Sequence, residues 1–281
     1  MKFHRAYVEI TNICGLECSF CPTKTAPTTT MKLDFFEKIL HELKPYTNEI
    51  ALHVMGDPLT LSNLNDYLDI AQKQNFKVMI TTSGYYLKNH PNLFHPSLKQ
   101  INISLNSFNK NTPKMSFEEY IEGVFALCKA RVDDEVFINL RLWNLDENNT
   151  EESYNQQVFE ALEKFFKIKI ETQAKTFRLA KKILLHFDSY FEWPSLKSTH
   201  LTHGFCHGLS AQIAILANGT VVPCCLDAEG IISLGSLHVN SLSEILHTKK
   251  VKDIQKGFQK GKAVEELCQK CSFKDRFNEL L

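Results

Sequence analysis

Short apolar runs of strand length alternate along the chain with stretches of helical periodicity. The strand-like runs cover residues 5–11, 50–55, 77–82, 100–106, 136–143 and 167–171. Among the helical stretches, residues 116–131 open with Ser116 and Glu119 at capping-box spacing, and another covers about residues 150–166. Six strand–helix units in this order predict a parallel sheet with right-handed crossovers.

The predicted strands have one apolar and one polar face. On the fifth strand, one face carries Val136, Ile138, Leu140 and Leu142, and the other carries Phe137, Asn139, Arg141 and Trp143. A sheet covered by helices on both sides would be apolar on both faces. A polar inner face instead fits a partly closed barrel whose lumen holds a ligand. We therefore predict an α/β fold, a partial (β/α)6 TIM-like barrel. An antiparallel sheet with one solvated face is the alternative, and the helical spacers argue against it.

By the same alternation, His53 and Glu171 are expected to point into the lumen. They are our candidate catalytic residues, as substrate contacts or as a proton acceptor. The alternative is that both are polar residues with ordinary hydrogen-bond partners.

The pattern changes near residue 199. Residues 211–225 are two alternating strands joined by Asn218-Gly219, which is a strong hairpin signal. A second capping box, Ser241 and Glu244, opens a helical stretch, and the chain ends soon after a C-x2-C at residues 268–271. We predict two domains: a barrel over residues 1–198 and a small β-hairpin/helix domain over residues 199–281.

Composition restricts the class of protein. The 281 residues are 43% hydrophobic and 23% charged, with a formal net charge of zero. No overall field attracts nucleic acid or an anionic membrane, and no apolar run is long enough to span a bilayer. The N-terminus lacks the apolar core of a signal peptide, so we expect a cytoplasmic protein. In that reducing compartment, the nine cysteines are better explained as ligands or catalytic thiols than as disulfides.

Three of these cysteines, Cys14, Cys18 and Cys21, form a C-x3-C-x2-C group directly after the first strand. This loop lies at the barrel mouth, where such folds keep their active sites. A structural zinc ion takes four ligands. Three thiolates instead suit a [4Fe–4S] cluster with one iron left open for an external ligand.

At these residues the chain resembles the radical S-adenosylmethionine (SAM) superfamily, whose cysteine group also has an aromatic residue before its last cysteine. The segment Gly56-Asp57-Pro58 resembles the family's Gly-Glu-Pro, with a carboxylate one methylene shorter, and the likeness covers roughly residues 5 to 175. It implies a catalytic [4Fe–4S] cluster on the three cysteines and a 5′-deoxyadenosyl radical made from bound SAM, which takes a hydrogen atom from the substrate. The SAM contacts that it implies are Phe20, Gly56, Asp57, Ser104, Asn106, Asn139 and Arg141.

A second cysteine group resembles the Twitch domain, the shortened form of the SPASM extension of these enzymes. Its members are Cys206, Cys224, Cys268 and Cys271. The Gly-x4-Cys spacing from Gly219 selects Cys224 over Cys225. The resemblance implies one auxiliary [4Fe–4S] cluster, saturated by four thiolates, that carries electrons. A zinc site with four cysteine ligands is the alternative.

The layout is most similar to Twitch enzymes that oxidise a secondary alcohol. We therefore expect a radical SAM oxidoreductase that oxidises a small polar molecule and uses the auxiliary cluster as electron acceptor. Modification of a peptide or protein side chain is the second hypothesis. The chain begins directly at the first strand, without a leader-peptide domain, and this favours the small molecule. A flavodoxin or ferredoxin is the implied electron donor. A non-catalytic zinc-binding module is the alternative from another class.

Overall fold

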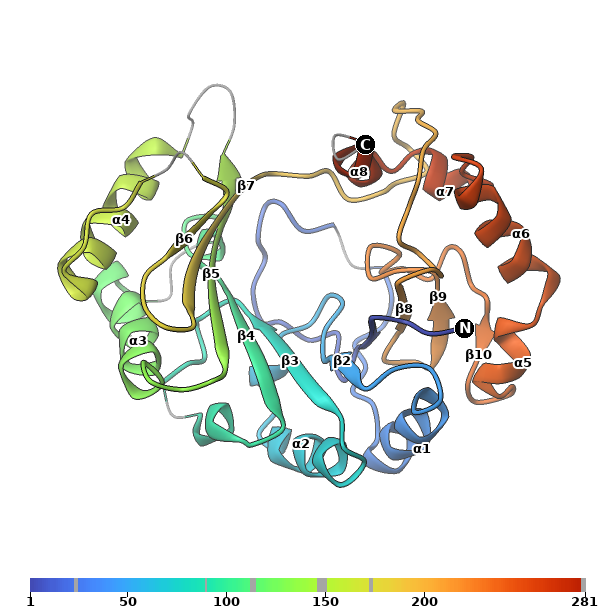
Figure 1. Ribbon diagram of the computed structural model, residues 1–281, viewed down its shortest axis with the longest axis horizontal. Coiled ribbons are helices and arrows are strands. Elements are labelled where there is room, and N and C mark those ends of the chain that lie inside the picture. Colours follow the sequence, from blue (N-terminus) through green and yellow to red (C-terminus); the bar gives the residue numbers. More distant parts are fainter. Residues whose placement is uncertain (23–24, 89, 112–114, 146–150, 172–173, 279–281) are drawn as a thin grey trace.

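The computed structural model describes residues 1–22, 25–88, 90–111, 115–145, 151–171 and 174–278, and its centre is one curved sheet (Figure 1). The sheet has ten strands in the order β10-β9-β8-β1-β2-β3-β4-β5-β7-β6. The strands are β1 (Arg5–Val8), β2 (Glu49–Ala51), β3 (Lys77–Thr82), β4 (Leu98–Ser104), β5 (Phe137–Leu145), β6 (Thr176–Arg178), β7 (Ile183–Ser189), β8 (Gln212–Ile215), β9 (Thr220–Val222) and β10 (Gly235–Ser236). Every neighbouring pair from β8 to β7 is parallel, which confirms the parallel sheet and excludes the antiparallel alternative.

The outer face of the sheet is covered by α1 (Leu33–Leu43), α2 (Leu64–Lys73), α3 (Phe117–Ala130) and α4 (Glu152–Phe166) (Figure 1). After β10 come α5 (Leu242–Leu246), α6 (Lys249–Gln259), α7 (Glu266–Gln269) and α8 (Asp275–Asn278), and Figure 1 shows α8 toward the open side of the curve. The apolar strand faces are buried against the covering helices: Val8, Ile80 and Leu140 have no exposed surface, and neither have Leu40 and Leu68. Each such side chain stabilises the fold by about 1.5–3 kcal/mol. The polar strand faces are left for the concave side.

Both predicted helix starts are present. Ser116 accepts a hydrogen bond from the Glu119 backbone N–H at 3.1 Å, although the Glu119 carboxylate pairs with Lys88 instead of closing the box. Ser241 and Glu244 make both bonds of a capping box at the start of α5. No helix in the described part of the chain is long and apolar enough to cross a membrane.

The predicted sixth strand, residues 167–171, is wrong. Lys167 ends α4 in the left-handed conformation (φ 56°), and the Ile168 and Ile170 N–H groups turn back to the backbone and side-chain oxygens of Glu163. The alternating isoleucines therefore belong to the segment that ends α4, not to a strand. The sixth parallel strand is β7, which pairs with β5 and carries β6 antiparallel on its outer edge. Glu171 is exposed on this connection, so the prediction that it faces the lumen is also wrong.

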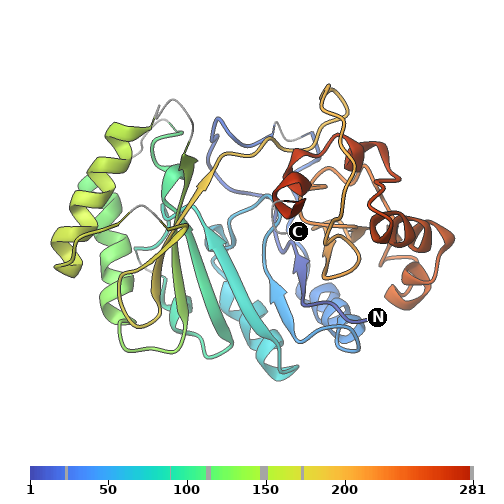
Figure 2. The ribbon, with the colours of Figure 1, turned by 45° about the horizontal axis from the view of Figure 1, so that its top comes forward.

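The C-terminal hairpin is confirmed as β8 and β9, and it joins the barrel. β8 pairs in parallel with β1, from Arg5↔Gln212 to Val8↔Ile215. The two predicted domains therefore share one sheet. Figure 2 shows α3 and α4 at one end of the curved sheet and the C-terminal helices at the other. This continuity fixes the C-terminal cysteines relative to the barrel.

Candidate active site

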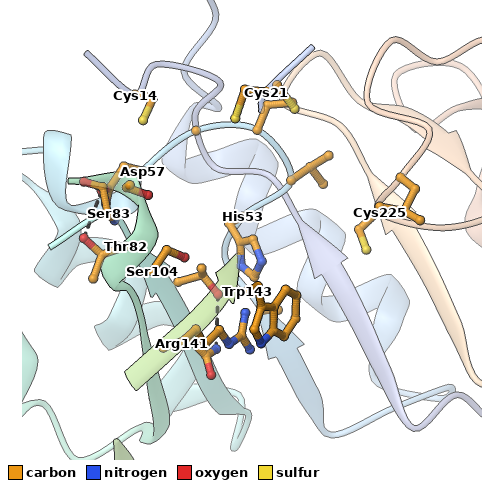
Figure 3. Close-up of a pocket in the computed structure, with 18 of the residues that line it drawn as sticks. Cys14, Cys21, His53, Asp57, Thr82, Ser83, Ser104, Arg141, Trp143 and Cys225 are labelled. Carbon is orange, nitrogen blue, oxygen red and sulfur yellow. Dashed lines mark hydrogen bonds between the residues drawn. The ribbon is translucent and has the colours of Figure 1, made fainter. Parts of the chain in front are cut away.

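A cavity of about 390 Å³ lies on the concave side of the sheet (Figure 3). It is lined by the inner faces of the parallel strands and by the segments that follow their carboxyl ends, where ligands bind in such sheets. Among the predicted site residues, the cavity brings together Cys14, Cys18, Cys21, Phe20, His53, Gly56, Asp57, Ser104, Asn106 and Arg141. Residues chosen from separate strands of the sequence thus surround one space.

Contacts within the protein, which do not depend on a bound ligand, hold the three-cysteine loop. Gly15 has φ +71°, and a β-carbon there would lie 2.3 Å from the Tyr86 hydroxyl oxygen, which donates a hydrogen bond to the Cys14 carbonyl at 2.9 Å. Asn111 binds the loop twice: its Oδ1 accepts from the Glu17 N–H at 2.8 Å, and its Nδ2 donates to Cys18 Sγ at 2.8 Å. The loop is therefore preorganised with its thiols toward the cavity.

The electrostatics suit Cys18 as a thiolate ligand. Hydrogen bonds from Cys21, Asn111 and Ser107, Cys21 first, outweigh burial and lower the pKa of Cys18 to about 6. Only the thiolate binds metal, so a low pKa favours occupancy at neutral pH. The donor set, three thiols on one loop at one end of a cavity, fits a cluster with a coordination position open to a second ligand.

Gly56 and Asp57 connect the ends of three strands. A β-carbon on Gly56 would lie 1.9 Å from the Thr11 carbonyl oxygen, and the Asp57 N–H donates to the Ile13 carbonyl at 3.0 Å. The Asp57 carboxylate is buried. It accepts four hydrogen bonds, from Leu59 N, Thr82 Oγ1, Ser83 N and Ser83 Oγ, at 2.9 to 3.0 Å. Burial raises its pKa, and these donors oppose the shift. The carboxylate positions the Gly56 segment and has few lone pairs left for a ligand.

The other end of the cavity is basic and aromatic. The Arg141 guanidinium carbon lies 4.6 Å from the centre of the Trp143 ring, and the Tyr7 and His53 rings meet edge to face at 5.6 Å. Burial, then the charges of Arg141 and Arg5, lower the pKa of His53 to about 3. Burial, then Arg5, lowers the pKa of Arg141 to about 10. Figure 3 shows Arg141 and Trp143 at the opposite end of the cavity from Cys14 and Cys21, with His53 between them.

Two predicted residues lie elsewhere. The Asn139 side chain is buried between strands, where it donates to Asn102 Oδ1 and its Oδ1 contacts His186 Nε2, both at 3.1 Å. It is not among the described residues that line the cavity, and its contacts make it a structural link between β4, β5 and β7. Glu171 is outside the cavity as well.

The auxiliary cysteines gather beside the hairpin. Burial raises the pKa of Cys206, Cys224, Cys268 and Cys271, and the charges of neighbouring thiols add to the rise for Cys206, Cys224 and Cys268. Four partly buried thiols can ionise together readily only with a multivalent cation among them, so the donor set fits an iron–sulfur cluster. Among the described residues, no three His, Cys, Asp or Glu side chains form a ready site for a single metal ion.

Lys274 is buried beside these cysteines, and its ammonium donates to the Cys268 and Cys271 carbonyls at 2.7 and 2.8 Å. Cys225 instead lines the cavity, near the Tyr7 hydroxyl, and burial raises its pKa to about 11. The two neighbouring cysteines of the hairpin thus differ in environment: Cys224 faces the other thiols and Cys225 the cavity.

Sequence reasoning missed Arg5, Tyr7 and Asn111. Arg5 and Tyr7 alternate with the buried Ala6 and Val8, so extending the polar face of β1 to its first residue would have found them. Asn111 lies in a connection after β4, and nothing in the pattern of that segment marks it.

Comparisons with known proteins agree with this geometry. Residues 8–155 match the model of the radical SAM superfamily, and residues 206–272 match the SPASM model, an iron–sulfur cluster-binding domain. A protein of Methanocaldococcus jannaschii, named as a glycyl-radical enzyme activating enzyme, is 26% identical over 99 residues, which are 35% of this chain and 38% of that protein.

Solved structures share the fold. BtrN in complex with AdoMet and 2-DOIA has 15% identity and a TM-score of 0.58, over 97% of this chain and 94% of that one. Streptococcus suis SuiB bound to SAM has 14% identity and a TM-score of 0.61, over 91% and 68% of the two chains. anSMEcpe with bound AdoMet has 14% identity and a TM-score of 0.62, over 96% and 83%.

Proposed function

Because the chain belongs to the radical SAM superfamily and carries a SPASM domain, we propose that it is an oxidoreductase acting on a small polar molecule. One observation carries the proposal. The cavity that holds Cys14, Cys18 and Cys21 is also lined by Cys225, the residue next to the auxiliary cysteine Cys224. A substrate in this cavity lies between the two cysteine groups.

The family implies a [4Fe–4S] cluster with SAM, and the SPASM domain implies auxiliary iron–sulfur binding. When bound, the first cluster and SAM supply a 5′-deoxyadenosyl radical that removes one hydrogen atom from the substrate. We assign the first cluster to Cys14, Cys18 and Cys21. We assign a single auxiliary cluster to Cys206, Cys224, Cys268 and Cys271. Phe20, Gly56, Asp57, Ser104 and Asn106 contact SAM in this proposal.

A two-electron oxidation also requires the loss of a proton and a second electron. His53 is our candidate proton acceptor. Its imidazole is neutral at pH 7, and its Nδ1 is buried without a hydrogen-bond partner among the described residues. In this proposal the second electron leaves toward the auxiliary cysteines. Cys225 and Leu226, which follow Cys224 in the chain, line the cavity. The hydrogen atom, proton and electron together balance the conversion of an alcohol to a carbonyl.

The volume of the cavity favours a small substrate. About 390 Å³ falls within the 300–1,000 Å³ typical of small-molecule sites, and in this proposal the substrate shares that space with SAM. Peptide modification is the second candidate, supported by structural neighbours solved with peptides, SuiB with precursor peptide SuiA and anSMEcpe with a Kp18Cys peptide. A candidate small molecule and a peptide library, compared by 5′-deoxyadenosine formation, separate the two.

The first test is the anaerobic iron and sulfide content of the wild type and of a Cys14→Ala/Cys18→Ala/Cys21→Ala variant. We expect about 8 Fe and about 4 Fe, the contents of two cubanes and one. Cys128→Ala is the control, since Cys128 is buried in α3 away from both groups and should retain the full content. A triple variant without iron would remove the auxiliary cluster from the proposal. Tight zinc and no SAM cleavage under reductant would support the non-catalytic module.

A further inference from the structure

Lysines are concentrated on α6 and on the turn that follows it. Between residues 247 and 264 the chain has six lysines and one acidic residue, although its overall net charge is zero. Four of these lysines are exposed and have no salt bridge within the part of the chain that the structure describes: Lys252, Lys256, Lys260 and Lys262. This part of the surface therefore has an excess of positive charge.

The stability of the helix does not explain this charge. Lys249 and Lys250 stand in the first turn of α6 and no acidic residue does, although the dipole of a helix favours the opposite. The acidic groups nearby are engaged, since Asp253, Glu265 and Glu266 pair with Lys249, Lys250 and Lys270 in that order. The polar faces of α1 and α4 carry both signs of charge, so α6 differs from helices that only face solvent.

The opposite face of α6 packs against the segment that carries an auxiliary cysteine. The Gln255 side chain donates to the Leu209 carbonyl at 2.7 Å. A β-carbon on Gly208 would lie 3.7 Å from Cys206 Sγ and also 3.7 Å from a ring carbon of Phe258, which is buried on α6. The lysines therefore belong to the helix that packs next to the site assigned to the auxiliary cluster.

Two exposed apolar side chains lie beside the end of α6. Leu201 is 72% exposed and Val264 is 42% exposed. Gln269, which follows the assigned ligand Cys268, connects their segments. Its carbonyl accepts from the N–H of the residue after Leu201 at 2.9 Å, and its side chain donates to the Val264 carbonyl at 3.4 Å. Val264 in turn contacts α6, since a β-carbon on Gly257 would lie 2.4 Å from its Cγ2. An apolar centre with a charged rim is typical of protein interfaces.

We propose that this α6 surface, made of Lys256, Lys260, Lys262, Leu201 and Val264, docks a small acidic protein that carries one electron. Redox partners use small, transient interfaces, and opposite charges bring the two surfaces together. The inference rests on the proposed function in that the electron comes from the auxiliary site, which received it from the substrate. The docked carrier gains this one electron and the auxiliary site loses it, and no bond or proton changes.

Nucleic acid and anionic membranes also attract lysines, but the α6 surface lacks the side chains that they require. Single strands bind where aromatic rings stack with the bases, and a membrane-binding helix directs its large apolar side chains outward. The apolar side chains of α6, Val251, Ile254 and Phe258, are buried in the protein instead. The neighbouring cysteines therefore favour a redox protein over both.

The probes are an acidic [2Fe–2S] ferredoxin and, as its basic counterpart, a cytochrome c of similar size. Their binding to the cluster-reconstituted wild type is measured by anaerobic biolayer interferometry at low and at physiological ionic strength. We expect saturable binding of ferredoxin that weakens as salt is added, and no binding of cytochrome c. Carbodiimide crosslinking of the ferredoxin complex, read by mass spectrometry, should join its carboxylates to Lys256, Lys260 or Lys262.

The variant is Lys256→Glu/Lys260→Glu/Lys262→Glu, and it should raise the Kd for ferredoxin roughly 10- to 100-fold. The matched control is Lys73→Glu/Lys129→Glu/Lys164→Glu. It changes the net charge equally at exposed lysines near the ends of α2, α3 and α4, and it should bind as the wild type does. The two variants are also combined with the triple cysteine variant that lacks the first cluster. Stopped-flow electron exchange between the auxiliary cluster and ferredoxin, with the stronger reductant mixed in its reduced form, should slow only for the α6 variant.

The docking surface would be overturned by equal binding of the two charge variants, by crosslinks confined to other lysines, or by equal rates of electron exchange. Tighter binding of single-stranded RNA or of phosphatidylserine vesicles than of ferredoxin would assign the lysines to one of those partners and would also overturn it. The comparison with cytochrome c and the crosslinks need only wild-type protein, so they stand if a variant misfolds. Iron content of the same samples separates the two proposals. Wild type without auxiliary iron would refute the proposed function, whereas full iron without ferredoxin binding would refute only the docking surface.

Discussion

Gly56 and Thr11 approach so closely that a β-carbon at residue 56 would lie 1.9 Å from the Thr11 carbonyl oxygen. The neighbour is backbone, so it cannot rotate away as a side chain would. We expect Gly56→Ala to separate the segment after β2 from the segment after β1 and to destabilise the protein by about 1–3 kcal/mol or more. The melting temperature, measured by anaerobic thermal unfolding, and the iron content should both fall.

Gly123→Ala is the control for this prediction. Gly123 lies within α3, its added β-carbon would be 3.6 Å from the nearest atom, and alanine favours the helix by about 0.5–1 kcal/mol. A Gly56→Ala protein with the iron content and melting temperature of the wild type would contradict the close packing.

Asn111 and Cys18 form the second relationship that can be tested. Asn111→Leu removes the 2.8 Å hydrogen bond to the Cys18 sulfur and the bond to the Glu17 N–H. The pKa of Cys18 should rise from its value of about 6, since a hydrogen bond that stabilises the thiolate is lost. In the metal-free protein, the midpoint of Cys18 alkylation against pH should move upward, and cluster reconstitution should be less complete.

Asn63→Leu is the matched control, because Asn63 is exposed before α2 and its side chain makes no capping bond. An unchanged alkylation profile in Asn111→Leu would assign the low pKa to Cys21 and Ser107.

The sequence predicted most of this site because the site is made of strand ends. Alternation along β4 and β5 placed Ser104 and Arg141 on the inner face, and the structure has both at the cavity. Alternation failed at residues 167–171, where two isoleucines pack after a helix end rather than on a strand. A period of two over five residues fits either arrangement, and only the left-handed Lys167 distinguishes them. Contacts between distant loops, such as Asn111 with Cys18, produce no periodic pattern in the sequence and could not be predicted from it.

His53 should make stability depend on pH. In the folded protein the pKa of His53 is about 3, below the ordinary value of 6.5. Between these pH values the unfolded chain binds a proton at His53 and the folded protein does not. Stability therefore falls as the pH drops below about 6.5. From pH 7.5 to 5.5 this one group should cost about 1.4 kcal/mol. The measurement is urea unfolding of metal-free wild type and His53→Gln at both pH values.

The variant should lose less stability than the wild type over this interval, because the other histidines titrate equally in both proteins. Equal losses would mean that His53 is protonated readily in the folded state. It would then not be the neutral imidazole that our proposal needs as proton acceptor.

Lys274 should set the potential of the auxiliary cluster. Its buried ammonium bonds the carbonyls of Cys268 and Cys271, so it lies beside two of the assigned ligands. A nearby positive charge stabilises the reduced, more negative state. We expect Lys274→Met to lower the reduction potential by on the order of 60 mV, equivalent to about 1.4 kcal/mol for one electron. A redox titration followed by electron paramagnetic resonance, in the triple variant that lacks the first cluster, measures this potential directly.

Lys270→Met is the control, because the Lys270 ammonium already pairs with Glu266 at 3.0 Å. Equal potentials in the two variants would refute a special role for Lys274.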